Sequence, residues 1–351
     1  MNKIKVSTGI YWVEIPEANL FILCGCPADS VKHLIKKGLI TYEDKGLGII
    51  CETGPNAILL SDIPMQKESI SNLAEFPVLQ MLYRQGMILP NHPNNIGIKP
   101  LLIGNENEVN AQIEYIYCGN YGLSSIDEIK MSGILENQAQ EMMRLKLKFA
   151  FDKIKRTQEL IETRIIGNEP VEIRNGVFIQ RKDLNLFEII YKGNRIQVDL
   201  NLAQDEEYEA PYHLGYHEIT REYFSVIHTG EGDGWDINRP CMASIITFQG
   251  RIYLIDAGPN IIHSLQALGI GVNEIEGIFH THAHDDHFNG LTALLRSDHR
   301  IKYYSTKLVR VSVMKKLAAL TSMDEVLLEK YFEVHDLDID EWNNVDGIEV
   351  K

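Results

Sequence analysis

Short apolar runs separated by turn residues fill the first 120 residues of the chain. The runs Leu20–Cys24, Ala57–Leu60 and Leu101–Gly104 have the length and composition of buried strands. Between them, Asp29–Lys37 and Ser71–Gln85 have the pattern of helices. Strand and helix patterns alternate along this part of the chain, which predicts a mixed α/β fold.

The middle of the chain changes pattern twice. Residues 124–164 are strongly helical, and they begin with Ser125-Ile126-Asp127-Glu128, which offers the side chains of a helix N-cap. Three β-rich runs follow, with hairpin turns between them, at Val171–Gln180, Leu186–Tyr191 and Arg195–Leu200. We therefore expect a mixed α/β N-terminal domain over residues 1–165 and a connection rich in β-hairpins over residues 166–215. No internal repeat is evident.

The remaining residues, 216–351, form a third segment that starts with strand patterns. Tyr223–His228 is one expected strand, and Ala243–Phe248 with Arg251–Ile255 is an expected hairpin. The glycine-rich residues 230–234 contain two carboxylates and lack the Lys-Ser/Thr pair of a phosphate-binding P-loop. We therefore interpret them as an ordinary turn rather than a phosphate cradle.

A cluster of histidines follows the short apolar strand Gly277–Phe279. Four of the 12 histidines fall between His280 and His287. Imidazole and carboxylate groups crowded at a strand end are costly unless something coordinates them, and both are ligands of zinc, iron and manganese. His282 and His284 lie two residues apart, so an extended backbone projects them to the same side.

The sequence around this cluster resembles the metallo-β-lactamase-fold hydrolases. Their signature Thr-His-x-His-x-Asp-His is met by Thr281, His282, His284, Asp286 and His287, and their upstream strand-end aspartate by Asp256. The resemblance implies a four-layer αββα sandwich with two divalent metal ions. Zinc is the expected metal, and iron and manganese are alternatives. It also implies that His282 and His284 hold the first metal and that Asp286 and His287 hold the second. Asp256 would orient the site from behind these ligands, and Asp286 would also steer the nucleophile.

Two further features bear on the resemblance. Members of the family complete the site with further ligands that lie later in the sequence. His335 is the histidine after His287 with the best claim to be one of them. We expect the chain to end inside the hydrolase domain. His280, His263 and His228 are expected to be structural. In the N-terminal part, residues 55–62 and 76–86 resemble bacterial proteins described as cyclic-nucleotide phosphodiesterase-like.

Composition narrows the class of substrate and partner. The 351 residues carry 34 Lys and Arg against 49 Asp and Glu, a formal charge of −15. Such a surface repels nucleic-acid polymers and anionic membranes, so a small molecule is the expected substrate. The five cysteines are scattered, and no signal peptide or membrane-spanning run is present, which favours the cytoplasm. A homo-oligomer is compatible with these properties.

The expected activity is therefore metal-dependent hydrolysis, in which a metal-bound hydroxide attacks a small phosphodiester such as a cyclic nucleotide. A thioester or a lactam is an alternative substrate for the same machinery. A di-iron redox or oxygen-binding protein is a second alternative, which His284 disfavours because flavodiiron-type members usually carry glutamate at that position. A non-catalytic regulatory protein is the third.

Overall fold

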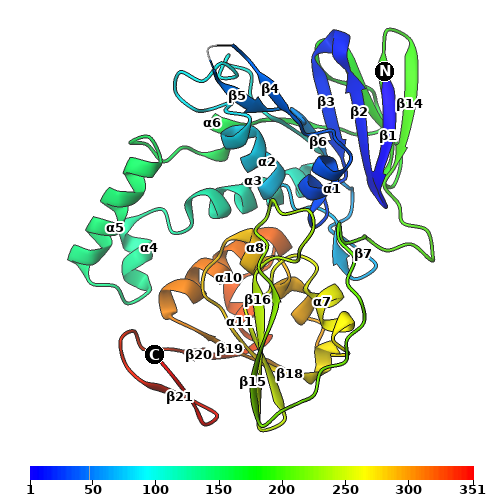
Figure 1. The fold of residues 1–351 in the computed structure, drawn as a ribbon. Helices are drawn as coiled ribbons and strands as arrows, with labels where there is room; N and C mark the ends of the chain where they lie inside the picture. Colours follow the sequence, from blue (N-terminus) through cyan, green and yellow to red (C-terminus); the bar gives the residue numbers. More distant parts are fainter. Residues whose placement is uncertain (47) are drawn as a thin grey trace. The chain divides into compact units, whose positions relative to one another are not determined.

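The computed structural model describes residues 1–46 and 48–351, and it divides into two compact units (Figure 1). Unit 1 contains residues 1–116 and 155–211, and unit 2 contains residues 117–154 and 212–351. Each unit is built on a six-stranded sheet with helices, so the expected mixed α/β class is confirmed. In the part of the chain just specified, no helix is both long and apolar enough to cross a bilayer.

The large sheet of unit 1 begins with antiparallel strands and continues with parallel ones. Its strands lie in the order β1 (Asn2–Ser7), β2 (Ile10–Ile15), β3 (Leu20–Cys24), β6 (Ala57–Leu59), β9 (Leu101–Gly104) and β10 (Glu162–Ile165). The first three are antiparallel neighbours, and the pairs from β3 onward are parallel. The strands expected from the three apolar runs are thus confirmed, as is the helix α1 (Ser30–Lys36).

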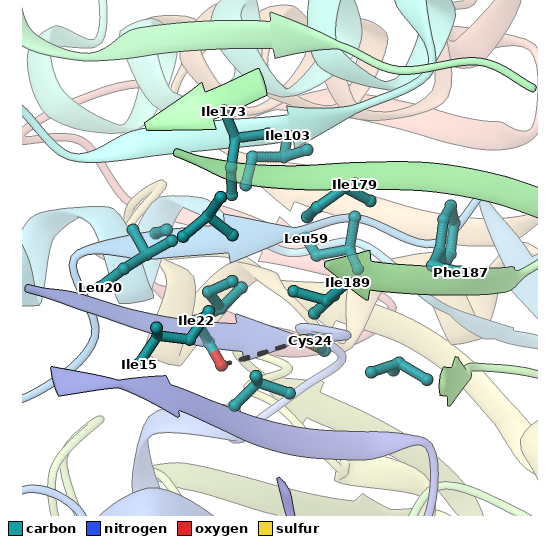
Figure 2. Packing of buried hydrophobic residues seen from close by; sticks show 14 of the residues in the cluster. Ile15, Leu20, Ile22, Cys24, Leu59, Ile103, Ile173, Ile179, Phe187 and Ile189 are labelled. Atoms are coloured by element: carbon teal, nitrogen blue, oxygen red, sulfur yellow. Dashed lines mark hydrogen bonds between the residues drawn. The ribbon is translucent and has the colours of Figure 1, made fainter. Parts of the chain in front are cut away.

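A second sheet covers one face of this first sheet. It consists of the antiparallel strands β11 (Val171–Arg174), β12 (Val177–Asp183), β13 (Leu186–Tyr191) and β14 (Asn194–Asp199). Apolar side chains from both sheets, such as Ile22, Leu59, Phe187 and Ile189, form one fully buried core between them (Figure 2). The hairpins expected in a connection therefore supply half of a sandwich, because alternate residues of each strand face this core.

The large sheet of unit 2 repeats the sheet of unit 1. Its strands lie in the order β15 (Phe224–Gly230), β16 (Ala243–Phe248), β17 (Arg251–Ile255), β18 (Ile275–Phe279), β19 (Ile301–Ser305) and β20 (Phe332–Asp336). Again the first three are antiparallel neighbours and the later pairs are parallel. Each sheet also has a register shift near the end of its first strand. The two units therefore share one topology.

The repeat extends to local backbone geometry. Helix α1 and helix α7 (Ile261–Ala267) each contain seven residues. Each follows a left-handed residue, Asp29 with φ +58° and Asn260 with φ +57°, and each leads to a left-handed glycine, Gly38 with φ +70° and Gly269 with φ +72°. Asn260 lies 231 positions after Asp29, and Gly269 lies 231 positions after Gly38 (260 − 29 and 269 − 38). The expectation of no internal repeat is therefore wrong, because the repeat lies in backbone conformation while most side chains differ.

Further correspondences fall on a helix start and on a hairpin. Asn105 accepts a hydrogen bond from the third residue of helix α3 (Glu106–Tyr121), and Thr306 does the same at helix α10 (Lys307–Thr321). Unit 2 also has a hairpin, β21 (Asn343–Val345) and β22 (Ile348–Val350), whose left-handed Asp346-Gly347 turn matches Asn175-Gly176 between β11 and β12. In the described chain, β13 and β14 have no counterpart in unit 2.

One segment of unit 2 comes from the middle of the chain. Helices α4 (Ile126–Met131) and α5 (Glu136–Phe149) share a small buried core with two residues of α10, Leu308 and Val311. The helices predicted over residues 124–164 are thus confirmed except at the end, where β10 begins. The other elements include α2 (Glu75–Leu79), α6 (Thr157–Leu160), α8 (Asp285–Phe288), α9 (Leu291–Leu294), α11 (Glu325–Glu329), and the short ladders β4 (Tyr42–Asp44) with β5 (Ile50–Glu52) and β7 (Met65–Gln66) with β8 (Ser69–Ile70).

Candidate metal centre

The expected ligands come together at one edge of the large sheet of unit 2. Strands β17 and β18 are parallel neighbours, so their carboxyl ends meet at the same edge. Asp256 directly follows β17, and the loop His280–His284 followed by helix α8 continues from β18. Asp256 has φ +60°, a left-handed conformation that aspartate tolerates better than most residues. This turn directs its carboxylate toward the loop.

The donor atoms of the expected ligands lie within reach of shared cations. One ligand atom from each of His282, His284 and Asp286 lies within 4.8 Å of the others, and the same holds for Asp256, His282 and His287. The Nε2 atom of His287 is 3.7 Å from a carboxylate oxygen of Asp286. All five predicted side chains are therefore in one cluster, while their division between a first and a second metal stays a prediction.

Asp256 supports the loop by accepting three hydrogen bonds. It receives the backbone N–H of Thr281 at 2.8 Å, the Thr281 hydroxyl at 2.7 Å and Nδ1–H of His287 at 2.8 Å. Burial alone would raise the pKa of Asp256, but the hydrogen bonds from His287 and Thr281 lower it below its ordinary value. Burial opposes protonation of His287, but the bond to Asp256 raises the pKa of that imidazole above its ordinary value.

These contacts also fix which ring nitrogens are available to a metal. Because Nδ1 of His287 donates to Asp256, its Nε2 atom keeps the lone pair. The Thr281 hydroxyl donates to Asp256 and is 2.9 Å from Nδ1 of His282, so it accepts from that nitrogen and leaves Nε2 of His282 free to coordinate. Oriented imidazoles next to a carboxylate are the donor set that zinc, iron and manganese share. The residues present therefore fit a divalent cation.

Glycines are required where the loop meets the strand end. A Cβ atom on Gly258 would stand 2.2 Å from the backbone oxygen of Asp286, and one on Gly290 would stand 2.3 Å from the oxygen of Gly258. The chain after β17 and the helix after the ligand loop thus touch backbone to backbone. In the glycine-rich turn, a Cβ atom on Gly230 would stand 2.6 Å from the oxygen of Pro240, which gives this glycine a packing role.

The other histidines of unit 2 have structural surroundings. His280 is buried between the rings of Phe288 and Tyr303, and burial lowers its pKa to about 4. His335 stacks on Tyr304 and pairs with Glu333, and it lies outside both ligand groups found in the described residues. His228 contacts the Ser244 hydroxyl, and His263 lies beside the ring of Tyr212.

Sequence reasoning missed a lysine that reaches the loop from a distant helix. Lys316 of α10 is buried, donates to the carbonyl of Ala283 at 2.9 Å and pairs with Asp285 at 2.7 Å. Its only signal in the sequence is a charged residue on that face of an amphipathic helix whose other residues are apolar and face the core. That signal does not identify a partner 31 residues away in the chain (316 − 285).

Unit 1 lacks this donor set at the equivalent edge. Gly25, with φ +77°, takes the place of Asp256, since each donates its N–H to the last residue of the next strand. Ser61 and Asp62 take the places of Thr281 and His282. The buried Asp62 carboxylate accepts from Arg181 Nε at 2.9 Å and from the backbone N–H of Asn185 at 2.8 Å. At this edge of unit 1, Asp62 is thus held by protein hydrogen bonds, whereas the equivalent edge of unit 2 carries the candidate ligands.

Comparison with known proteins matches the segment that carries the motif. Residues 224–351 match the family model described as Anti-Pycsar protein Apyc1. The chain is 28% identical over 151 residues to the cAMP/cGMP-dependent 3',5'-cAMP/cGMP phosphodiesterase B of Dictyostelium discoideum, which is 41% of this chain and 14% of that protein. It is 43% identical over 58 residues to Ribonuclease Z of Clostridium kluyveri, which is 16% of this chain and 19% of that protein.

Among solved structures, a new diphosphatase from the PhnP family shares 19% identity and covers 35% of this chain and 54% of its own, with a TM-score of 0.29. The chain spans less than a fifth of the length of the curated relatives it matches. The family match and the curated relatives confirm the resemblance of the motif-bearing segment to metallo-β-lactamase-fold hydrolases.

Proposed function

With residues 224–351 taken as a metallo-β-lactamase-fold segment, we propose that the protein is a metal-dependent hydrolase of small phosphodiesters, of which cyclic nucleotides are the first candidates. The observation that carries the proposal is the convergence of three imidazoles and a carboxylate on one edge, with Asp256 and Thr281 fixing the coordinating nitrogens. The cyclic-nucleotide phosphodiesterases of Dictyostelium discoideum support the choice of substrate class.

The residues of the chain divide the work of such a site. His282, His284, Asp286 and His287 would hold two divalent cations, with zinc as the first candidate. Bound cations would supply Lewis acidity and lower the pKa of a coordinated water. Asp256 holds the Nδ1 proton of His287, and Thr281 holds that of His282, so neither ring can rotate without losing a hydrogen bond. The formal charge of −15 disfavours long polyanions and leaves small phosphodiesters as compatible substrates.

Hydrolysis by the zinc-loaded protein tests this proposal. We expect turnover of bis-p-nitrophenyl phosphate and of cyclic AMP or cyclic GMP, and a loss of at least 100-fold in His282→Ala because a ligand is removed. His335→Ala is the matched control, since His335 lies outside the ligand groups, and it should keep wild-type turnover.

Metal content separates the proposal from its rivals. Colourless protein with bound zinc excludes the di-iron redox protein, whereas an iron–oxo absorption band in the active species contradicts the zinc hydrolase. If the metal-loaded wild type hydrolyses a thioester or a lactam but no phosphodiester, the substrate class is that of the acyl compound and not a phosphodiester. No turnover of any of the three would favour a regulatory protein.

A further inference from the structure

The buried ammonium group of Lys316 is the least expected charge near the metal centre. Lys316 is 1% exposed and lies on α10, which is otherwise packed through apolar residues. Its Nζ atom is 2.7 Å from a carboxylate oxygen of Asp285, which is 5% exposed. Burying two charges costs more than a well-packed apolar pair would, so such a pair needs a reason other than stability.

The ammonium group has other contacts besides the ion pair. It donates to the carbonyl oxygen of Ala283 at 2.9 Å, and it lies 4.9 Å from the ring centre of Phe288, which is fully buried. A carboxylate, a carbonyl and an aromatic face thus surround one cation, and each interaction is favourable in a dry environment. These contacts constrain the position of the ammonium group.

These contacts fall on the residues that alternate with the ligands. Ala283 separates the first two ligand histidines, and Asp285 separates His284 from Asp286. Lys316 therefore binds the ligand loop at both of these intervening residues. The loop is therefore held on either side of His284, through the Ala283 backbone carbonyl and the Asp285 side chain.

Unit 1 supplies an internal comparison. The residue ten positions after the N-cap is Lys316 in α10 and Tyr115 in α3 (316 − 306 and 115 − 105). Tyr115 is fully buried and carries no charge. At this helix position, the unit with the candidate ligands has a buried cation, and unit 1 has a neutral side chain.

The residue before Lys316 provides a matched control. Lys315 pairs with Glu128 of α4 at 2.6 Å, in the contact between α10 and the α4–α5 helices. It is the same residue type on the same helix, and its ion pair also lies within unit 2. It has no hydrogen bond or ion pair to the ligand loop among the described contacts.

We propose that Lys316 is a positioning residue of the metal centre, which fixes the ligand loop through the Ala283 carbonyl and the Asp285 carboxylate. This inference rests on the proposed function only as far as metal binding. It assigns a role to α10 that neither the ligand motif nor the family match provides. It also connects the metal loop, through α10, with the α4–α5 segment from the middle of the chain.

Zinc affinity of full-length variants tests the proposal. By chelator competition with zinc alone, we expect Lys316→Met to bind 10- to 100-fold more weakly than wild type, the range for residues that support metal ligands. Lys315→Met should bind within twofold of wild type. With Co²⁺ in place of zinc, the d–d absorption band should shift in Lys316→Met and stay unchanged in Lys315→Met, because it reports ligand geometry rather than stability.

A double variant separates positioning from the cost of an unpaired buried charge. Lys316→Met alone removes the ammonium group that faces the buried Asp285 carboxylate and lowers stability. Adding Asp285→Asn removes that charge, so the double variant should recover much of the melting temperature while zinc binding stays weak. If it folds and binds zinc within twofold of wild type, Lys316 has no positioning role. The same conclusion follows if Lys316→Met is folded and binds zinc as tightly as Lys315→Met.

Failure of the proposed function gives a different result. A wild-type protein that binds zinc but hydrolyses no phosphodiester contradicts the proposed activity and leaves the Lys316 test valid. A wild-type protein that binds no zinc overturns both proposals. Wild-type affinity in the Lys316 variants of an active enzyme overturns only the positioning role.

Discussion

Replacing Asp256 by Asn removes one charge from the metal centre with little change in shape. Asn adopts left-handed backbone conformations readily, so the φ of +60° adds no strain. Three donors now face this side chain, two at one oxygen and one at the other. An amide has a single acceptor oxygen. In one orientation of the amide, the backbone N–H of Thr281 therefore faces the NH2 group. In the other orientation, the Thr281 hydroxyl and Nδ1–H of His287 face it.

The magnitude follows from the hydrogen bonds to a charged acceptor. Each contributes about 1.5–3 kcal/mol, so losing one and weakening two removes roughly 2 kcal/mol or more of support for Thr281 and His287. A loss of 1.4 kcal/mol corresponds to a tenfold change in affinity, and we expect zinc affinity in Asp256→Asn to fall by about 10- to 100-fold.

Isothermal titration of zinc, or competition with a chelator, measures this directly. Far-UV circular dichroism and a melting curve of the metal-free protein establish that the variant is folded. Asp346→Asn is the control, because it makes the same chemical change at the left-handed turn of the β21–β22 hairpin. Zinc affinity of Asp256→Asn within threefold of that control would refute the view that Asp256 orients the ligands.

Three other changes have expected outcomes. Burial would raise the pKa of Asp346, but Lys302 and Tyr253 lower it, so this carboxylate stabilises the fold above its ordinary pKa near 4, and that stability is lost as the pH falls through the lowered value. Thermal unfolding at pH 7 and pH 3 should therefore show a smaller pH effect in Asp346→Asn by about 1 kcal/mol, and an unchanged pH effect would contradict the assignment. Gly258→Ala should cost about 1–3 kcal/mol in denaturant unfolding and weaken zinc binding, because its Cβ atom meets the backbone of Asp286 at 2.2 Å; a variant as stable as wild type would show that the loop can shift freely. Asp62→Ala should destabilise the protein by roughly 2–3 kcal/mol in urea, after allowance for the partial exposure of Arg181, and leave zinc affinity unchanged, whereas weaker zinc binding would point to a metal role for unit 1.

The ligand cluster could be predicted from the sequence because its information is local. His282, His284, Asp286 and His287 fall within six residues, and a strand that ends at Phe279 places them at a sheet edge. Asp256 lies further away, but it also ends a strand, and two parallel strand ends that are neighbours must meet. The motif therefore carries the identity of the candidate ligands and their approximate position.

The support for the loop could not be predicted in the same way. Lys316 acts through Ala283 and Asp285 from a helix whose sequence shows only that one inward position carries a charge. Which loop this charge meets depends on how α10 packs on the sheet.

The repeated topology was hidden for a related reason. Gly25 and Asp256 share a backbone conformation, yet their side chains have no chemistry in common. A comparison of side-chain types along the chain does not detect such a pair. The boundaries of the units were hidden as well, because the α4–α5 helices lie in sequence between the two segments of unit 1 but pack on α10 of unit 2.

The shared left-handed position after β3 and β17 restricts how this fold can gain or lose a metal centre. Only glycine, asparagine and aspartate adopt that conformation at low cost. One unit has glycine there and the other has aspartate. Glycine and aspartate codons can differ in a single second base, so the aspartate expected to orient the ligands is one base change away from the glycine of unit 1. Duplicated copies of such a unit can therefore diverge into a metal-binding member and a metal-free member without passing through a strained backbone.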